Sequence, residues 1–266
     1  MKNKLKSKIS KKAQLALLVI VAIIIITAIV VVYLYVQNPI KSNLAESNPQ
    51  EYIKSCVKNS LEGAEKELID NNFYPNIKDN YLFYNKDGKP VKVKYMCKAS
   101  QFYMPCVNQE PMLVSYLTRE IEKRVGSKTE ECFSDLKKIL RSKGYSVEER
   151  EIGNKSVEVQ LISQKINLYL NEKITIKKGE DARTYNRLNV EMNSPLYDLA
   201  DTARTILNYE SELCEFNTLN WEKNFPKISI TRFVTSDQSK VYILKYKLSG
   251  KSVEIAVKSC VLPAGI

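Results

Sequence analysis

The hydrophobic residues of this chain are concentrated in one uninterrupted stretch, from Leu15 to Val36. Its 22 positions contain no charged residue, no glycine and no proline, and Thr27 is the only aliphatic hydroxyl. As a helix rising about 1.5 Å per residue, the stretch measures roughly 33 Å, which exceeds the hydrocarbon thickness of about 30 Å. The pattern predicts a transmembrane helix within residues 13–36.

The charges beside this stretch predict its direction. Residues 1–12 form a tail with six lysines and no acid, whereas Lys41 is the only basic residue within ten positions after Val36. The positive-inside bias then places the N-terminus in the cytoplasm and residues 37–266 outside. We expect four residues with polar ends at the membrane interfaces: Lys11, Lys12, Tyr33 and Tyr35.

A cleaved secretory signal is the alternative interpretation of the same stretch. Such a signal has an apolar region of about 7–15 residues, followed by small residues at the cleavage site. Here the run is longer, and residues 33–39 read Tyr-Leu-Tyr-Val-Gln-Asn-Pro, without an Ala-x-Ala pattern. The sequence favours an uncleaved anchor.

Beyond residue 36 the hydrophobic positions become periodic. Residues 37–47 are polar, and we expect a stalk there. The spacing after the stalk predicts helices from Asn48-Pro49 to about residue 70, from Pro111 through Ile121, over about residues 129–142 with Gly144 as terminator, and from Ser194-Pro195 to about residue 217.

Alternating and β-branched segments predict strands between these helices. A hairpin is expected from residues 81–84 and 91–95 around Asn85–Gly88, and a three-stranded meander from 227–234, 241–248 and 252–260. Further strands are predicted at 156–162, 166–170, 172–177 and 184–192, with a turn at 178–181. Strands and helices in separate runs indicate an α+β fold, with one compact extracytoplasmic domain over residues 48–266. A subdivision near residue 150 stays open.

The net charge of +11 for the whole chain overstates how basic the portion beyond residue 36 is. All 30 acidic residues and 35 of the 41 basic residues lie beyond residue 36, so the predicted outer portion carries only +5. Interspersed charges of both signs are typical of an ordinary solvated surface. We therefore expect no nucleic-acid partner, and we expect the lipid bilayer and other envelope or surface proteins as partners.

The residue types that are missing exclude several kinds of chemistry. The chain has no histidine, which rules out Ser-His-Asp and Cys-His catalysis and histidine-ligated zinc. Only 8 glycines occur, and no phosphate-binding or dinucleotide-binding fingerprint is present. No cofactor and no metal are expected.

Six cysteines lie beyond the predicted span, an even number that suits disulfides in an oxidising compartment. Six cysteines allow fifteen complete pairings. Cys97 and Cys106 flank a short loop, and a bond between them contributes roughly 2–3 kcal/mol on the loop-entropy relation. We add Cys214–Cys260 and Cys56–Cys132 as the other expected pairs. Buried free thiols and a metal site are the alternatives, although no CxxC spacing occurs.

Few side chains suggest chemistry or modification. Asp198 and Asp201 stand one helical turn apart, with Arg204 a further turn on, as an acid–base pair would need. A solvated helix face with i,i+3 charge pairing explains them more simply, and the same holds for Glu210, Glu212 and Glu215. Trp221 and the 16 tyrosines are candidates for a carbohydrate or peptide platform. Asn154-Lys155-Ser156 is a glycosylation sequon.

The start of the chain, Lys11-Lys12-Ala13-Gln14 before the apolar run, resembles the class III signal of archaeal type IV pilin precursors. The resemblance implies cleavage between Ala13 and Gln14 and assembly into a filament. It covers only the first 36 residues. Leu18 stands where pilins usually carry Glu, and Pro39 interrupts the long helix that pilins continue into their heads.

The whole chain resembles a group of single-span envelope proteins from small-genome (DPANN-type) archaea. The shared features are the Lys-Lys-Ala-Gln run, residues 52–56 (Tyr-Ile-Lys-Ser-Cys), and residues 132–136 (Cys-Phe-Ser-Asp-Leu) followed by Gly144. The Gly-Gly expected after the first outer helix is replaced by Asn71-Asn72. The resemblance implies location and architecture only.

These observations predict a single-pass surface protein with a binding or structural role and no catalysis. A pilin-like filament subunit is the first alternative, and an envelope hydrolase that uses Asp or Glu is the second.

Overall fold

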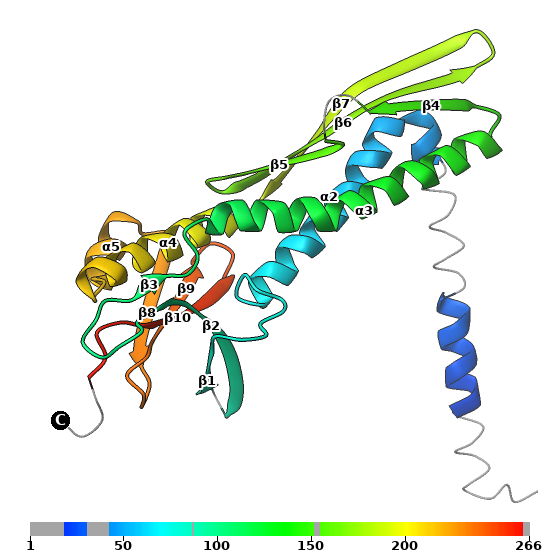
Figure 1. Ribbon diagram of the computed structural model, residues 1–266. Coiled ribbons are helices and arrows are strands. Elements are labelled where there is room, and N and C mark those ends of the chain that lie inside the picture. The colour runs from blue at the N-terminus through cyan, green and yellow to red at the C-terminus, as the bar shows by residue number, and fades with distance from the viewer. Residues whose placement is uncertain (1–18, 31–42, 87, 152–154, 263–266) are drawn as a thin grey trace, which may run out of the picture. The chain divides into compact units, whose positions relative to one another are not determined.

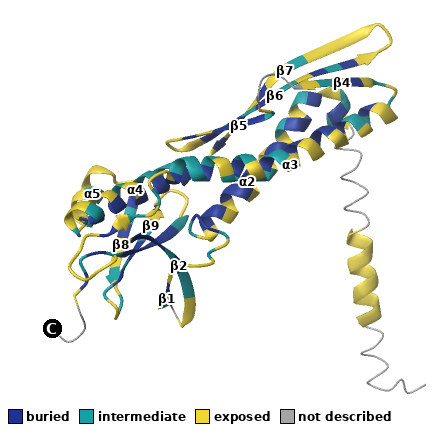
Figure 2. Cartoon of the chain, viewed as in Figure 1, coloured by how far each residue is buried: buried dark blue, intermediate teal, exposed yellow. Residues whose placement is uncertain are grey.

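The computed structural model describes residues 19–30, 43–86, 88–151 and 155–262, and the chain divides into two compact units after Tyr52. In the first unit, residues 19–30 form a helix with exposed side chains, drawn in yellow in Figure 2. Residues 43–47, predicted as part of the stalk, are also helical. The flanks of the predicted span, with Lys11–Gln14, Tyr33 and Tyr35, lie outside the described residues. None of the helices formed by described residues is long and apolar enough to cross a membrane.

Helix α2 (Pro49–Asp70) begins and ends where the sequence predicts. The backbone N–H of Glu51 donates to the side chain of Asn48 at 3.1 Å, which satisfies one of the free donors of the first turn. At the other end, the N–H of Phe73 donates to the carbonyl of Leu68 at 2.7 Å, and Asn72 and Phe73 adopt positive φ angles. The chain therefore leaves the helix in a left-handed turn.

Helix α3 (Leu113–Ser142) corrects the prediction of two separate helices. The helix continues through Gly126 and Ser127 because the buried stripe is unbroken on both sides, from Ile121 and Val125 to Thr129 and beyond. Burial of that stripe outweighs the cost of about 1 kcal/mol for one interior glycine. The predicted terminator is confirmed: Gly144 has a φ of +83°, and the N–H of Tyr145 returns to the carbonyl of Leu140.

One sheet of the second unit combines the predicted hairpin and the predicted meander (Figure 1). The meander pairs β8, β9 and β10 in antiparallel order, and the hairpin joins it through a parallel pairing of β2 with β10 that sequence analysis missed. The short β3 pairs with β2. The strands are β1 (Tyr81–Lys86), β2 (Lys89–Lys98), β3 (Val107–Asn108), β8 (Ile228–Val234), β9 (Lys240–Tyr246) and β10 (Ser252–Lys258).

The second sheet is built around one long strand, β6 (Lys165–Lys178). The sequence predicted two strands here, 166–170 and 172–177, and the structure joins them into one strand whose register with β7 shifts between Leu170 and Lys173. Its first half pairs with β5 (Val157–Ile162) and its second half with β4 (Ser146–Glu151). The strand β7 (Asp181–Asn193) completes the sheet. The charged β4 was not predicted because its sequence, Ser-Val-Glu-Glu-Arg-Glu, has little hydrophobic alternation.

Helix α4 (Leu196–Leu213) contacts strands of both sheets, β9 and β10 in the first and β5 in the second. Its buried side consists of the residues Leu196, Leu199, Ala200, Thr202, Ala203, Ile206, Leu207 and Glu210. The helix ends at Cys214, which has a left-handed conformation, rather than near residue 217. A short helix that was not predicted, α5 (Thr218–Asn224), follows and packs against β8.

The structure pairs the cysteines as Cys56–Cys132, Cys97–Cys106 and Cys214–Cys260, which are the predicted pairs. The first bond joins α2 to α3. The other two lie beside each other, because the N–H of Cys106 donates to Ser259, the neighbour of Cys260. Cys56–Cys132 and Cys214–Cys260 join segments that are 76 and 46 residues apart, whereas Cys97–Cys106 closes a short loop.

Three buried glutamates connect the elements of the second unit in the same way. Each carboxylate accepts a hydrogen bond from one lysine and from one hydroxyl group, and the exposed fraction of each residue is between 0% and 6%. The sets are Glu65 with Lys251 and Ser194, Glu210 with Lys240 and Tyr242, and Glu254 with Lys86 and Tyr84.

Two glycines at α3 have opposite conformational requirements. An added Cβ at Gly126 meets nothing within 4 Å, whereas Gly144 has a left-handed backbone. We expect Gly126→Ala to raise the free energy of unfolding by about 0.5–1 kcal/mol and Gly144→Ala to lower it by about 1 kcal/mol. Urea unfolding of the two variants beside the parent protein measures both changes. The same sign for both would contradict a continuous helix that ends at Gly144.

Lys240 neutralises a carboxylate that is fully shielded from water. We expect Lys240→Met to lower the free energy of unfolding by about 3–5 kcal/mol, because Glu210 is left charged and unpaired. Lys245→Met, on the exposed side of the same strand, is the matched control and should change stability by less than about 0.5 kcal/mol. The double variant Glu210→Gln/Lys240→Met should recover much of the loss in the same urea titration. A Lys240→Met protein as stable as its control would show that this pair does not hold the helix.

Candidate functional site

A pocket of about 370 Å³ opens on the second unit, lined by residues of α4, of α5, of the start of β8 and of the end of β9. Its apolar lining is mainly aromatic: Tyr197, Trp221, Phe225 and Tyr246. Its polar lining includes the charged side chains Asp198, Asp201 and Lys227. A mixture of aromatic surface and a few polar groups is typical of small-molecule sites.

Helix α4 contributes the acidic wall through its first two turns. Both oxygens of the Asp198 carboxylate accept hydrogen bonds, from the Ser163 hydroxyl at 2.8 Å and from the backbone N–H of Gln164 at 2.9 Å. These donors lie in the turn between β5 and β6, so Asp198 connects α4 to the second sheet. Asp201, one turn further on, pairs with Arg204 at 2.6 Å.

Helix α5 and the residues after it contribute the aromatic wall. Asn217 caps the helix by accepting from the N–H of Asn220 at 3.0 Å, and Glu222 anchors it by accepting from the N–H of Ile230 on β8 at 2.7 Å. The rings of Trp221 and Phe225 stack with centroids 4.1 Å apart and planes 24° apart. Half of the Phe225 surface stays exposed. One face of Phe225 is therefore fixed against Trp221 and the other is open.

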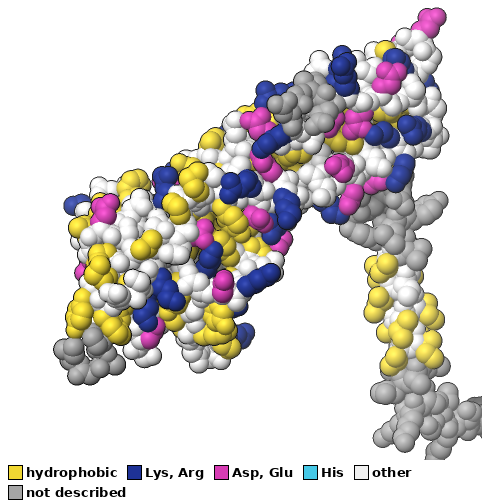
Figure 3. All heavy atoms as spheres, in the orientation of Figure 1, with side chains coloured by type: hydrophobic (Ala, Val, Ile, Leu, Met, Phe, Trp, Pro, Cys, Tyr) yellow, Lys and Arg dark blue, Asp and Glu magenta, His cyan; other side chains and the backbone are white. Residues whose placement is uncertain are grey.

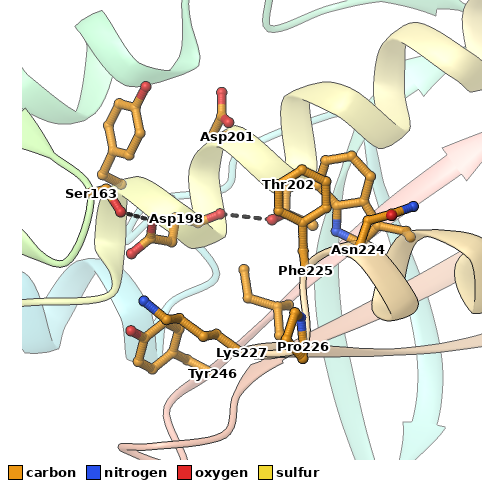
Figure 4. A pocket seen from close by; sticks show the side chains of 12 residues that line it. Ser163, Asp198, Asp201, Thr202, Asn224, Phe225, Pro226, Lys227 and Tyr246 are labelled. Atoms are coloured by element: carbon orange, nitrogen blue, oxygen red, sulfur yellow. Dashed lines mark hydrogen bonds between the residues drawn. The ribbon is translucent and has the colours of Figure 1, made fainter.

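Asp198 and Phe225 lie on opposite sides of the cavity, with Lys227 and Tyr246 below them in the view of Figure 4. Burial raises the pKa of the Tyr246 hydroxyl, and the negative charge of Asp198 raises this pKa further. Lys227 extends toward the Asp198 side, and it forms no ion pair within 4 Å with the residues that the structure describes. The pocket thus offers hydrogen-bond donors and acceptors on one side and a flat ring on the other.

A second pocket of about 340 Å³ shares Tyr246 with the first. Its lining is more polar, with amide and hydroxyl side chains from Gln164, Asn193 and Ser249. Ser163 lines the first pocket and its neighbour Gln164 lines the second, so the two depressions adjoin along the β5–β6 turn. A ligand longer than one pocket can extend into the other.

The indole of Trp221 carries a further polar group at this site. Its Nε1 is buried and has no hydrogen-bond acceptor among the residues that the structure describes. An unsatisfied buried donor costs about 1–3 kcal/mol, and native proteins keep few of them. The chain contains no other tryptophan, so the indole fluorescence of the protein originates at this pocket.

The structure separates the polar residues that sequence analysis grouped together. Asp201 and Arg204 form the expected i,i+3 pair, whereas Asp198 is engaged with the β5–β6 turn. The prediction of a solvated Glu210 is wrong, because this carboxylate has no exposed surface and binds Lys240 at 2.7 Å. Glu215 pairs with Arg232 at 2.9 Å, and Glu212 is exposed. Asn154 of the sequon lies outside the described residues.

The sequence marked Trp221, Asp198 and Asp201 as candidates, but not the other residues around them. Tyr197, Phe225, Lys227 and Tyr246 come from segments up to about fifty residues apart, and no local pattern marks them as neighbours. The one available signal is the run of aromatic residues from Phe216 to Phe225 around the only tryptophan.

The part of the chain that the structure describes contains no group of three or more Cys, Asp or Glu side chains placed to hold a metal ion. Charges of both signs are interspersed over the visible surface of the second unit (Figure 3). Comparisons with protein-family models, with curated proteins and with solved structures find no match for this chain.

The two acidic residues of the pocket, Asp198 and Asp201, make different contacts. Asp198→Ala removes acceptors for two donors of the β5–β6 turn, and we expect the free energy of unfolding to fall by about 1–2 kcal/mol. Asp201→Ala removes an exposed ion pair and should cost less than about 1 kcal/mol. Chemical unfolding at neutral pH compares the two. An equal loss for both variants would contradict the role of Asp198 as the link to the second sheet.

Proposed function

We propose that the chain is a single-pass membrane protein whose disulfide-bonded domain lies outside the cell and binds a ligand in the pocket at Trp221. The anchor is supported by the apolar stretch Leu15–Val36 and by the six lysines that precede it. The compartment is supported by three disulfides, since such bonds persist mainly in oxidising surroundings.

The stacked and half-open Phe225 opposite Asp198 is the observation that carries the binding role. An aromatic ring that is already fixed loses little conformational entropy when a ligand packs on it. The pocket is therefore preorganised for recognition.

The contacts that the carboxylates of Asp198 and Asp201 already make favour a binding role over the alternative of a hydrolase. General acid–base catalysis needs carboxyl groups that can approach a substrate atom and exchange a proton with it. Both oxygens of Asp198 already accept hydrogen bonds, and Asp201 is paired with Arg204. These contacts suit carboxylates that position a ligand.

The orientation of the protein can be tested with epitope tags at the two ends of the full chain. We expect an antibody to label a C-terminal tag on intact cells, and to label an N-terminal tag only after the cells are permeabilised. The lysine-rich tail stays inside because of the positive-inside bias. The reverse labelling would overturn the proposed location, and with it the disulfide argument.

The N-terminal sequence of the mature protein separates the anchor from the pilin-like alternative. A start at Met1 or Lys2 supports the uncleaved anchor. A start at Gln14 supports processing of the class III type and a place in a filament.

A further inference from the structure

The pocket at Trp221 has the chemistry of a site for a ring that is apolar on its faces and polar at its edge. The open face of Phe225 carries the negative side of the aromatic quadrupole, which attracts C–H groups of partial positive charge. Because Trp221 stacks behind it at 4.1 Å, the Phe225 ring cannot turn away from a ligand easily. This wall therefore recognises a flat array of C–H bonds.

The opposite wall recognises groups that both donate and accept hydrogen bonds. Across the cavity from Phe225, the Asp198 carboxylate supplies acceptors and the Lys227 ammonium supplies donors. Hydroxyl groups are the ligand groups that match such a mixture, since each one donates once and accepts twice.

The charges of the pocket exclude strongly charged ligands. Asp198 opposes the entry of a phosphate or carboxylate group, and Lys227 is the only basic residue among the described residues that line the pocket, so no basic cluster reverses this. A cationic ligand would meet Lys227, and Asp201 is already neutralised by Arg204. A neutral ligand gives the best electrostatic match.

The adjoining pocket indicates that the ligand extends beyond one ring. Gln164, Asn193 and Ser249 present amide and hydroxyl groups there, and Tyr246 lies between the two depressions. The depressions, at about 370 and 340 Å³, lie near the lower end of the range of about 300–1,000 Å³ that small-molecule pockets occupy.

From this geometry we propose that the site binds a neutral carbohydrate, with one pyranose ring on Phe225 and its hydroxyls toward Asp198 and Lys227, and a second sugar unit in the pocket lined by Gln164. The inference rests on the proposed binding role of this pocket, but it does not depend on which side of the membrane the domain occupies.

The single tryptophan allows a direct test on the full-length protein. The chain is purified in a detergent without a sugar head group, because glycoside detergents would compete for the site. Neutral di- to tetrasaccharides of glucose, galactose, mannose and N-acetylglucosamine are titrated while the emission of Trp221 is recorded. The acyclic polyol sorbitol and tetra-alanine serve as matched probes without a pyranose ring. We expect a saturable change for at least one oligosaccharide, confirmed by calorimetry, and none for sorbitol.

Two variants link this signal to the proposed geometry. Phe225→Leu keeps a bulky apolar side chain but removes the flat ring, and it should weaken sugar binding at least tenfold without unfolding the domain. Phe102→Leu changes an aromatic residue that is also about half exposed but lies outside the pocket, and it should leave the affinity unchanged. Retained circular dichroism and melting temperature verify that both variants fold.

Each negative outcome has a distinct meaning. No saturable response to any oligosaccharide of the series would overturn the carbohydrate inference, and so would an affinity that Phe225→Leu leaves intact. A response to tetra-alanine that depends on Phe225 would also overturn it, while the proposed binding role of the pocket would stand.

Discussion

The second unit depends on buried carboxylates that are neutralised where its elements cross. Glu65, Glu210 and Glu254 each sit almost without exposed surface, and each is bound by one lysine and one hydroxyl group. A buried charge is tolerated only when such partners are in place, so these contacts specify which surfaces may meet. Glu65 relates α2 to the start of α4 and the β9–β10 turn, Glu210 relates α4 to β9, and Glu254 relates β10 to the hairpin. Together with the disulfides, these glutamate contacts hold in one arrangement helices and strands that are distant from each other in the sequence.

Contacts of this kind also hold the two walls of the candidate site in place. Helix α4 is held near its C-terminal end by Glu210 and Lys240, and near its N-terminal end by Asp198 and the β5–β6 turn. The aromatic wall is held by the cap at Asn217 and by Glu222, whose carboxylate accepts from β8. These contacts hold both walls of the pocket in place, and a rigid site loses less entropy on binding.

The distribution of charge along the chain bears on the kind of ligand that we propose for the pocket. Most of the excess of lysine lies in the tail before the apolar stretch, and the folded part carries charges of both signs. A surface of this kind does not attract polyanions over long distances. Under the proposed binding role, recognition relies on short-range contacts, which a pocket with an aromatic wall and a polar wall can provide. Steric fit and hydrogen bonding, rather than electrostatic attraction, would then set the selectivity.

Local signals in the sequence determined the features that depend on a few adjacent residues: the cap at Asn48, the stop at Gly144, the hairpin and the meander. The structure forms the disulfide pairs that were expected, although the sequence alone left fifteen complete pairings open. Tertiary packing decided what local signals leave open. Burial carried α3 through Gly126, and the approach of β9 turned Glu210 from an apparently solvated residue into a buried ion-pair partner. The pocket depends wholly on tertiary packing, since Ser163, Trp221 and Tyr246 become neighbours only when α4 docks between two sheets. Periodicity reports which side of an element is apolar, but it contains no information about which distant segment that side will meet.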